Sequence, residues 1–279
     1  MSLSMKVVAR AVLAAVGTWG ISSQASATEL QITITNDQPA NSGFGIAPLW
    51  VGLQNGAYTT FTSGGSASSA VETAAELGSS SGITSAFTGN GPETTVGGGR
   101  LAPGGTATAL INVANPAATR YLDYLQMVVP SNDFFLGNAN PAGVPLFDAS
   151  GNFTGTQTIV LTGSNVWDAG TEVDNIAFGA ADVVGDNATD HVAANGTVTP
   201  VFGGSINETA YLNSILGVTT ADGYVVSHLI SAGDPIETIT ITAVPEPSAV
   251  ALLGGAVLAT LIIWRFHGRV VKPRVATAA

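Results

Sequence analysis

The sequence predicts an all-β domain, a β-sandwich with one short helix, between two terminal segments that carry export signals. Three observations favour this fold class. The middle of the chain is rich in Gly, Thr, Ser, Asn, Ala and Val. Short stretches in which apolar and polar residues alternate recur along it, as they do in strands with one buried face. Clusters of Gly, Asn and Pro separate these stretches as turns. The sequence shows no internal repeat with a period of 20–50 residues. We therefore expect one domain over residues 28–243.

The individual elements follow from the same patterns. One helix is expected at Ser68 to Leu77, because Val71, Ala74, Ala75 and Leu77 share one side of a helical period. A largely apolar stretch at 121–129 predicts a core strand, and the other stretches alternate with period two. The expected strands lie at residues 30–35, 106–113, 121–129, 158–161 and 237–241.

Residues 1–27 have the pattern of a secretory signal. Lys6 and Arg10 form a basic start, residues 11–21 an apolar run, and Ala25 and Ala27 a small-x-small cleavage site before Thr28. The alternative is an N-terminal membrane anchor. A bilayer requires about 20 apolar residues, and this run is shorter, which favours cleavage.

The C-terminal segment, residues 244–279, predicts a transmembrane helix. An apolar run at 249–264 is followed by four basic residues, an order in which the cations stay cytoplasmic and the rest lies outside. Pro245, Glu246 and Pro247 precede the run. This order resembles the PEP-CTERM sorting signal of Gram-negative bacteria. The resemblance implies an exosortase as partner, residence in the inner membrane before processing, and a final place at the cell surface or in an exopolysaccharide matrix. A retained C-terminal anchor is the alternative.

The charge of the chain narrows the classes of partner. The whole chain has 8 basic and 19 acidic residues and a net charge of −11. Across residues 28–244 only Arg100 and Arg120 oppose 18 acidic side chains, a net charge near −16. Such a surface repels phosphate backbones, which argues against nucleic acid as a partner, and divalent cations are its natural counterions. The chain has no cysteine, which excludes thiolate metal sites and disulfides.

Acidic residues concentrate in two segments, 128–137 and 166–175. The first places Asp133 between a Pro turn and two Phe residues, and the second holds Asp168, Glu172 and Asp174 around Gly170. Ca²⁺ takes six to eight oxygen ligands, commonly from loops of this kind. A third segment, 182–190, has a carboxylate at every fourth residue and is interpreted as a solvated loop, with a second Ca²⁺ loop as the alternative.

Taken together, the segments Pro-Ser-Asn-Asp-Phe-Phe (130–135), Leu-Phe-Asp (146–148) and Trp-Asp-Ala-Gly-Thr-Glu (167–172) resemble the spondin N-terminal domain family. Residues 72–77 and 101–105 are similar to its bacterial branch. The resemblance implies a C2-like antiparallel β-sandwich that binds Ca²⁺ in loops at one end. The carboxylates that match the family motifs, and are therefore expected as metal ligands, are Asp133, Asp168 and Glu172, where Glu172 stands in place of the usual Asp.

The expected function is non-enzymatic binding or adhesion, with extracellular polysaccharide or another surface protein as the partner, and two other classes remain open. A carbohydrate-binding module would need exposed aromatic side chains, although core packing is their more common fate in a sandwich. A glycoside hydrolase would need two carboxylates several Å apart, which the sequence neither singles out nor excludes. A serine hydrolase motif does not occur, and His191 and His228 have no companions at zinc-ligand spacing. The aromatic candidates are Trp50, Tyr58, Phe61, Phe134, Phe135 and Trp167.

Overall fold

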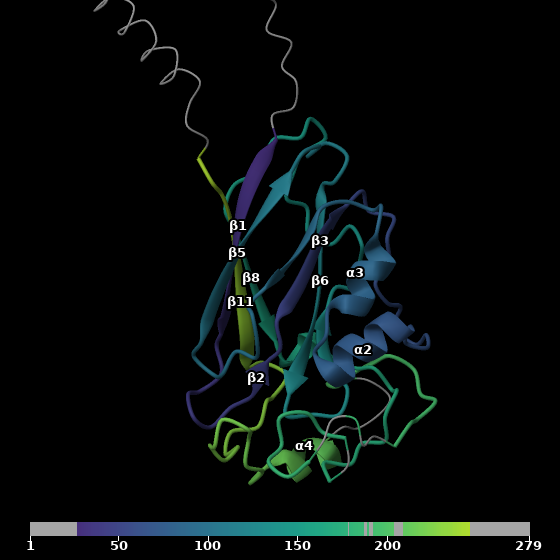
Figure 1. Ribbon diagram of the computed structural model, residues 1–279, viewed down its shortest axis with the longest axis vertical. Helices are drawn as coiled ribbons and strands as arrows, with labels where there is room; N and C mark the ends of the chain where they lie inside the picture. The colour runs from purple at the N-terminus through teal and green to yellow at the C-terminus, as the bar shows by residue number, and fades with distance from the viewer. Residues whose placement is uncertain (1–26, 178, 187–188, 190–191, 204–208, 246–279) are drawn as a thin grey trace, which may run out of the picture.

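The computed structural model describes residues 27–177, 179–186, 189, 192–203 and 209–245 (Figure 1). Within these residues the chain forms two antiparallel β-sheets that face each other across a shared apolar core. The prediction of a mostly antiparallel β fold of sandwich type is confirmed.

The smaller sheet has four strands in the order β5-β1-β11-β8. Their apolar residues alternate with threonines, so Ile32, Ile34, Ile239 and Ile241 point into the core, where each is at most 1% exposed. All four strands were predicted from this alternation. Their bounds are β1 (Thr28–Asn36), β5 (Thr106–Val113), β8 (Gln157–Thr162) and β11 (Pro235–Ala243).

The larger sheet has seven strands, in the order β10-β9-β7-β6-β3-β4 with β2 paired to β6. Its central strands β3 and β6 are buried almost throughout, because the other sheet covers one face and helices cover the other. That double burial explains why they appear in the sequence as apolar runs without alternation. The bounds are β2 (Gly45–Ile46), β3 (Leu49–Gln54), β4 (Glu93–Val96), β6 (Tyr121–Val129), β7 (Phe134–Gly137), β9 (Val166–Asp168) and β10 (Thr199–Pro200).

The structure has more helices than the one that the sequence predicted. The expected helix is α2 (Ser69–Leu77), which Ser68 caps by accepting a hydrogen bond from the Val71 amide, and which ends at Gly78. Two further helices, α3 (Ser81–Phe87) and α4 (Thr209–Ile215), and a 3₁₀ turn η1 (Gly163–Asn165) also form. The helices α2 and α3 lie side by side against the outer face of the larger sheet (Figure 1).

Part of the space between this sheet and its helices is filled by aromatic side chains, of which Tyr58 and Trp167 are partly buried. Trp50 and Tyr58 each meet Phe87 edge to face, with ring centroids 5.1 and 5.0 Å apart. Phe61 meets Phe135 and Trp167 in the same way at 5.0 and 5.1 Å. Core packing is therefore the fate of these side chains, as the sequence interpretation favoured, and they form no exposed platform.

The two ends of the described domain lie together. Ala27 directly precedes β1 and Pro245 lies two residues after β11; both are exposed, and the two strands are neighbours in one sheet. Figure 1 shows β1 beginning and β11 ending at the same end of the sandwich. Ala25, Glu246, Pro247 and the expected membrane helix at 249–264 lie outside the described residues. Among the residues described, no helix has the length and apolar character needed to span a bilayer.

Candidate metal centre

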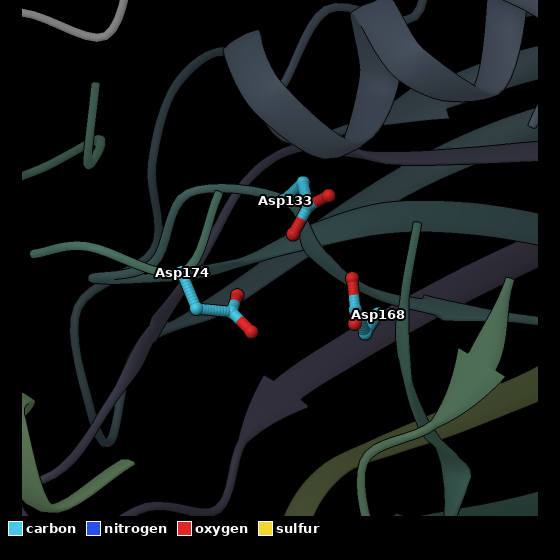
Figure 2. A group of neighbouring side chains, drawn as sticks. All are labelled: Asp133, Asp168 and Asp174. Atoms are coloured by element: carbon cyan, nitrogen blue, oxygen red, sulfur yellow. The ribbon is translucent and has the colours of Figure 1, made fainter. Parts of the chain in front are cut away.

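Three aspartates gather near the end of the sandwich where β6 ends, which lies opposite to the start of β1. Asp133, Asp168 and Asp174 each offer one carboxylate oxygen, and these oxygens all lie within 4.8 Å of one another. Figure 2 shows the three carboxylates turned toward a common point. Asp133 and Asp168 are buried, whereas Asp174 is exposed. The group therefore has a closed side formed by the sheet and an open side toward solvent.

The register of the larger sheet brings the first two aspartates together. Asp133 directly precedes β7, and Asp168 is the last residue of β9, where it pairs with Phe134. The turn before Asp133 is fixed by Ser131, whose hydroxyl donates to the Val128 carbonyl at 2.5 Å and accepts from the Phe134 amide at 3.2 Å. Two segments far apart in sequence thus converge through strand pairing.

Gly170 explains the turn that follows Asp168. Its φ of +67° lies in the left-handed region, and a Cβ at this position would lie 2.7 Å from the Thr197 amide nitrogen. Only glycine satisfies both conditions. The turn directs the amides of Thr171 and Glu172 back toward Asp133, while the Gly170 amide donates to Asp168 Oδ1 at 2.6 Å.

The two oxygens of Asp133 have different surroundings. Oδ2 accepts three hydrogen bonds, from the Thr171 amide at 2.8 Å, the Thr171 hydroxyl at 3.1 Å and the Glu172 amide at 3.2 Å. Oδ1 is fully buried and receives no hydrogen bond from an amide or hydroxyl of a described residue, while the carboxyl groups of Asp133 and Asp168 lie within hydrogen-bonding reach of each other. A buried carboxylate oxygen without a donor is costly unless a proton or a cation meets it.

The electrostatics of the pair agree with this geometry. Burial, and next the negative charge of Asp133, raise the pKa of Asp168 to about 8. Burial also raises the pKa of Asp133 above its ordinary range, against the hydrogen bonds that lower it. Two buried carboxylates this close do not both stay ionised unless positive charge lies between them. The arrangement is suited to hold a cation.

Glu172, which the family resemblance suggested as a ligand, is not part of this group. Its Oε2 accepts a hydrogen bond from Asn132 Nδ2 at 3.0 Å. Burial raises the pKa of Glu172 to about 8, and the negative charges of Glu76 and Asp133 add to the effect. Asp174 is the third member instead. Asp174 lies in the same acidic segment of the sequence but beyond the end of the family motif, so the resemblance does not imply it as a ligand.

The helix α4 supports the loop that carries Asp133. The Asn132 amide donates to the Tyr211 hydroxyl at 2.7 Å, and that hydroxyl donates to the Asn132 side-chain oxygen. The Tyr211 ring also meets Phe134 edge to face, with centroids 5.2 Å apart. The loop next to the centre is thus anchored from both sides, by β7 and by α4.

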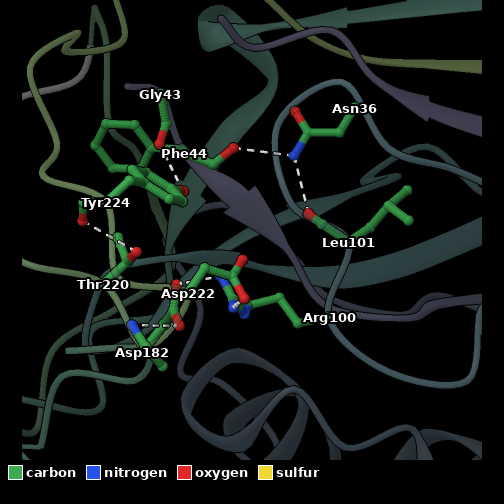
Figure 3. A network of polar contacts seen from close by, with 10 residues as sticks. Asn36, Gly43, Phe44, Arg100, Leu101, Asp182, Thr220, Asp222 and Tyr224 are labelled. Atoms are coloured by element: carbon green, nitrogen blue, oxygen red, sulfur yellow. Dashed lines mark hydrogen bonds and ion pairs between the residues drawn. The ribbon is translucent and has the colours of Figure 1, made fainter. Parts of the chain in front are cut away.

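The third acidic segment, 182–190, has a structural role in the part that is described. Asp182 Oδ2 lies 2.7 Å from Arg100 Nη1, and Nη2 of the same guanidinium pairs with Asp222 (Figure 3). The side chain of Asp182 is only 3% exposed, so the interpretation as a solvated loop is wrong for this residue. Asp182 is thus part of an ion pair with Arg100. Asp190 and His191 lie outside the described residues.

His228, the other histidine considered as a zinc ligand, lies away from the aspartate group. Its Nε2 is 3.5 Å from Asp234 Oδ2, and both side chains are partly exposed. Within the described chain the candidate centre therefore consists of oxygen donors alone.

A comparison with models of known protein families finds no match for this chain, and a comparison with curated proteins also finds none. The resemblance to the spondin family accordingly rests on the residues of the motifs, among them Asp133, Asp168 and the glycine that turns the chain after Asp168.

Proposed function

We propose that this protein is an exported, non-enzymatic binding protein of the spondin type. In this proposal it holds Ca²⁺ with Asp133, Asp168 and Asp174 and acts in adhesion at the cell surface or in an exopolysaccharide matrix. The observation that carries the proposal is the convergence of these three carboxylates beside Asp133 Oδ1, a buried oxygen that receives no hydrogen bond from an amide or hydroxyl of any described residue.

The donor set supports a hard cation, and Ca²⁺ in particular. All three ligands are carboxylates, whereas zinc and other softer metals favour imidazole or thiolate. Two ligands come from strand ends and the third from a loop, which gives a site with uneven rigidity. Ca²⁺ tolerates such irregular geometry and completes its shell with carbonyl oxygens and water, while Mg²⁺ requires a nearly ideal octahedron. The exposed Asp174 leaves room for these further ligands.

The position of the centre supports a role in binding outside the cell. The two predicted export signals adjoin the start of β1 and the end of β11 in the sequence, and the aspartates lie near the opposite end of β1, where β6 ends. A protein held by its C-terminal segment would therefore present the metal end away from the membrane. A cation there neutralises three carboxylates and stabilises the loops that would meet a partner.

A retention assay tests this function. Full-length protein is mixed with exopolysaccharide-coated cells of the producing bacterium, with Ca²⁺ or with a chelator, and the bound fraction is measured. We expect retention with Ca²⁺ and its loss with chelator or in Asp168→Asn. Glu72→Gln, which removes a charge from the first turn of α2, is the matched control and should bind as the wild type does.

Two outcomes would replace the proposal. Retention that is independent of Ca²⁺ and competed by one defined sugar would favour the carbohydrate-binding module. Release of reducing sugar ends, abolished by a single carboxylate-to-amide change, would establish a glycoside hydrolase.

A further inference from the structure

A second buried carboxyl group lies inside the sandwich and takes no part in the metal centre. Glu237 belongs to β11 in the smaller sheet, and Gln126 belongs to β6 in the larger sheet. Glu237 is 0% exposed and Gln126 is 2% exposed. Gln126 Nε2 donates a hydrogen bond to Glu237 Oε2 at 2.6 Å, so the pair links the two sheets.

The other oxygen of each side chain carries the argument. Glu237 Oε1 and Gln126 Oε1 are both fully buried, and neither receives a hydrogen bond from a described residue. If Glu237 were ionised, its carboxylate could only accept hydrogen bonds. Glu237 Oε1 and Gln126 Oε1 would then both lack a donor. A proton on Glu237 Oε1 supplies one O–H donor, and the amide oxygen of Gln126 is an acceptor on the same partner. One proton shared between these two oxygens would satisfy both.

We propose that Glu237 is a neutral carboxylic acid in the folded protein, joined to Gln126 by two hydrogen bonds that bridge the sheets, and that loss of its proton destabilises the sandwich. This inference concerns the core and is independent of the proposed Ca²⁺ site.

The charged surroundings favour the neutral form. Asp37 and Tyr124 are the titratable groups that interact with Glu237, and Asp37 adds negative charge. Asn36, the cross-strand neighbour of Glu237, donates its side-chain amide to the carbonyls of Phe44 and Leu101. Arg100 is engaged with Asp182 and Asp222, and the Arg120 Nε donates to the Phe147 carbonyl. Neither arginine is available to neutralise a carboxylate at position 237.

The resulting dependence on pH has a definite sign. Burial raises the pKa of Glu237 to about 8 from its ordinary 4.5, against the hydrogen bond from Gln126 and with a further rise from Asp37. Between these two values the unfolded chain has released the proton and the folded chain has kept it. The contribution of Glu237 to the free energy of unfolding is therefore fully present below pH 4.5. It falls as the pH rises and is lost above about pH 8.

A comparison of Glu237→Gln with the wild type tests the proposal. The new side-chain amide donates where the acid proton did, so the variant should be as stable as the wild type at about pH 5. Denaturant unfolding of the full-length proteins is measured in a chelator from about pH 5 to about pH 9. The ratio of their unfolding constants should change about tenfold per pH unit near the middle of this range, because one proton is linked. Glu72→Gln should follow the wild-type profile.

Parallel pH profiles for the wild type and Glu237→Gln would overturn the proposal. A direct titration keeps the test decisive if the variant does not fold. In wild-type protein labelled with ¹³C-glutamate, the side-chain carboxyl resonance of Glu237 should titrate with a pKa of about 8. A midpoint near 4.5, the ordinary value for glutamate, would also overturn it.

Discussion

At the residue scale, Asp133 shows how one buried side chain organises two segments. Its Oδ2 fixes the 171–172 turn through three hydrogen bonds, and its Oδ1 is buried beside the aspartate group without an amide or hydroxyl donor among the described residues. Oδ2 therefore stabilises the turn, and Oδ1 belongs to the aspartate group. Replacement of Asp133 would disturb the turn as well as the ligand set, so the neighbouring positions are better probes of metal binding.

Asp174 and Glu172 distinguish the aspartate group of the structure from the ligands that the family resemblance implies. Asp174→Asn removes a ligand charge, and we expect the Ca²⁺ dissociation constant to rise by about tenfold or more. Glu172→Gln keeps the acceptor for Asn132 and should change affinity by less than about threefold, since only a nearby charge is lost. Calorimetric titration of both variants measures this. The reverse order of effects would assign the third ligand to Glu172.

Arg100 connects two loops through its ion pairs with Asp182 and Asp222. Arg100→Met leaves the buried Asp182 carboxylate without its partner, and we expect the free energy of unfolding to fall by about 1–3 kcal/mol. Asp222→Asn removes the other partner, which is 40% exposed, and should cost less than about 1 kcal/mol. Denaturant unfolding compares the two. Equal effects would show that burial of Asp182 is not what gives the pair its strength.

At the element scale, α2 depends on the residue that ends it. Gly78 has a φ of +61°, and a Cβ there would lie 2.9 Å from the Ala47 Cβ. Gly78→Ala should therefore lower the free energy of unfolding by about 1–2 kcal/mol or more, which denaturant unfolding measures. Gly98→Ala, in a loop with nothing within 4 Å, is the matched control and should stay within about 0.5 kcal/mol of wild type. A harmless Gly78→Ala would mean that α2 ends elsewhere.

The sequence predicts those elements in which the pattern of apolar and polar residues shows which side chains will be buried. The strand β6 forms at the predicted residues because its apolar run is nearly continuous, and the threonine alternation of β1 and β11 predicts both strands. The helix α3 escapes prediction, since Ser-Gly-Ile-Thr has poor helix propensity and burial of Ile83 and Phe87 stabilises it. Local pattern cannot report this tertiary support.

The candidate site is predictable to a similar degree. Asp133 and Asp168 stand in recognisable motifs, and strand pairing brings them together. The selection of Asp174 over Glu172 depends on how the chain turns after Gly170, which spacing does not determine. The ion pair of Arg100 with Asp182 joins residues 82 positions apart, and no local signal in the sequence indicates such a contact.

At the scale of the whole molecule, the acidic net charge and the position of the aspartate group both favour stabilisation by a bound cation. The domain carries 18 acidic and two basic residues over 28–244, and both arginines are engaged in internal contacts. Among the described residues, Arg100 is therefore the one basic side chain that can reduce the repulsion between carboxylates at the end of the sandwich that holds the three aspartates. A bound divalent cation would relieve it and raise the stability of the whole sandwich. With free Ca²⁺ at about 100 times the dissociation constant, the gain is about 2.7 kcal/mol.

A calorimetric Ca²⁺ titration of the full-length protein, with thermal unfolding alongside, for wild type and Asp168→Asn decides whether the three aspartates hold a metal ion. We expect a stoichiometry near one and a higher melting temperature with Ca²⁺ for the wild type, and the loss of both in the variant. The absence of binding to the wild type at millimolar Ca²⁺ would contradict it, and the three aspartates would then have to share protons instead of a metal ion.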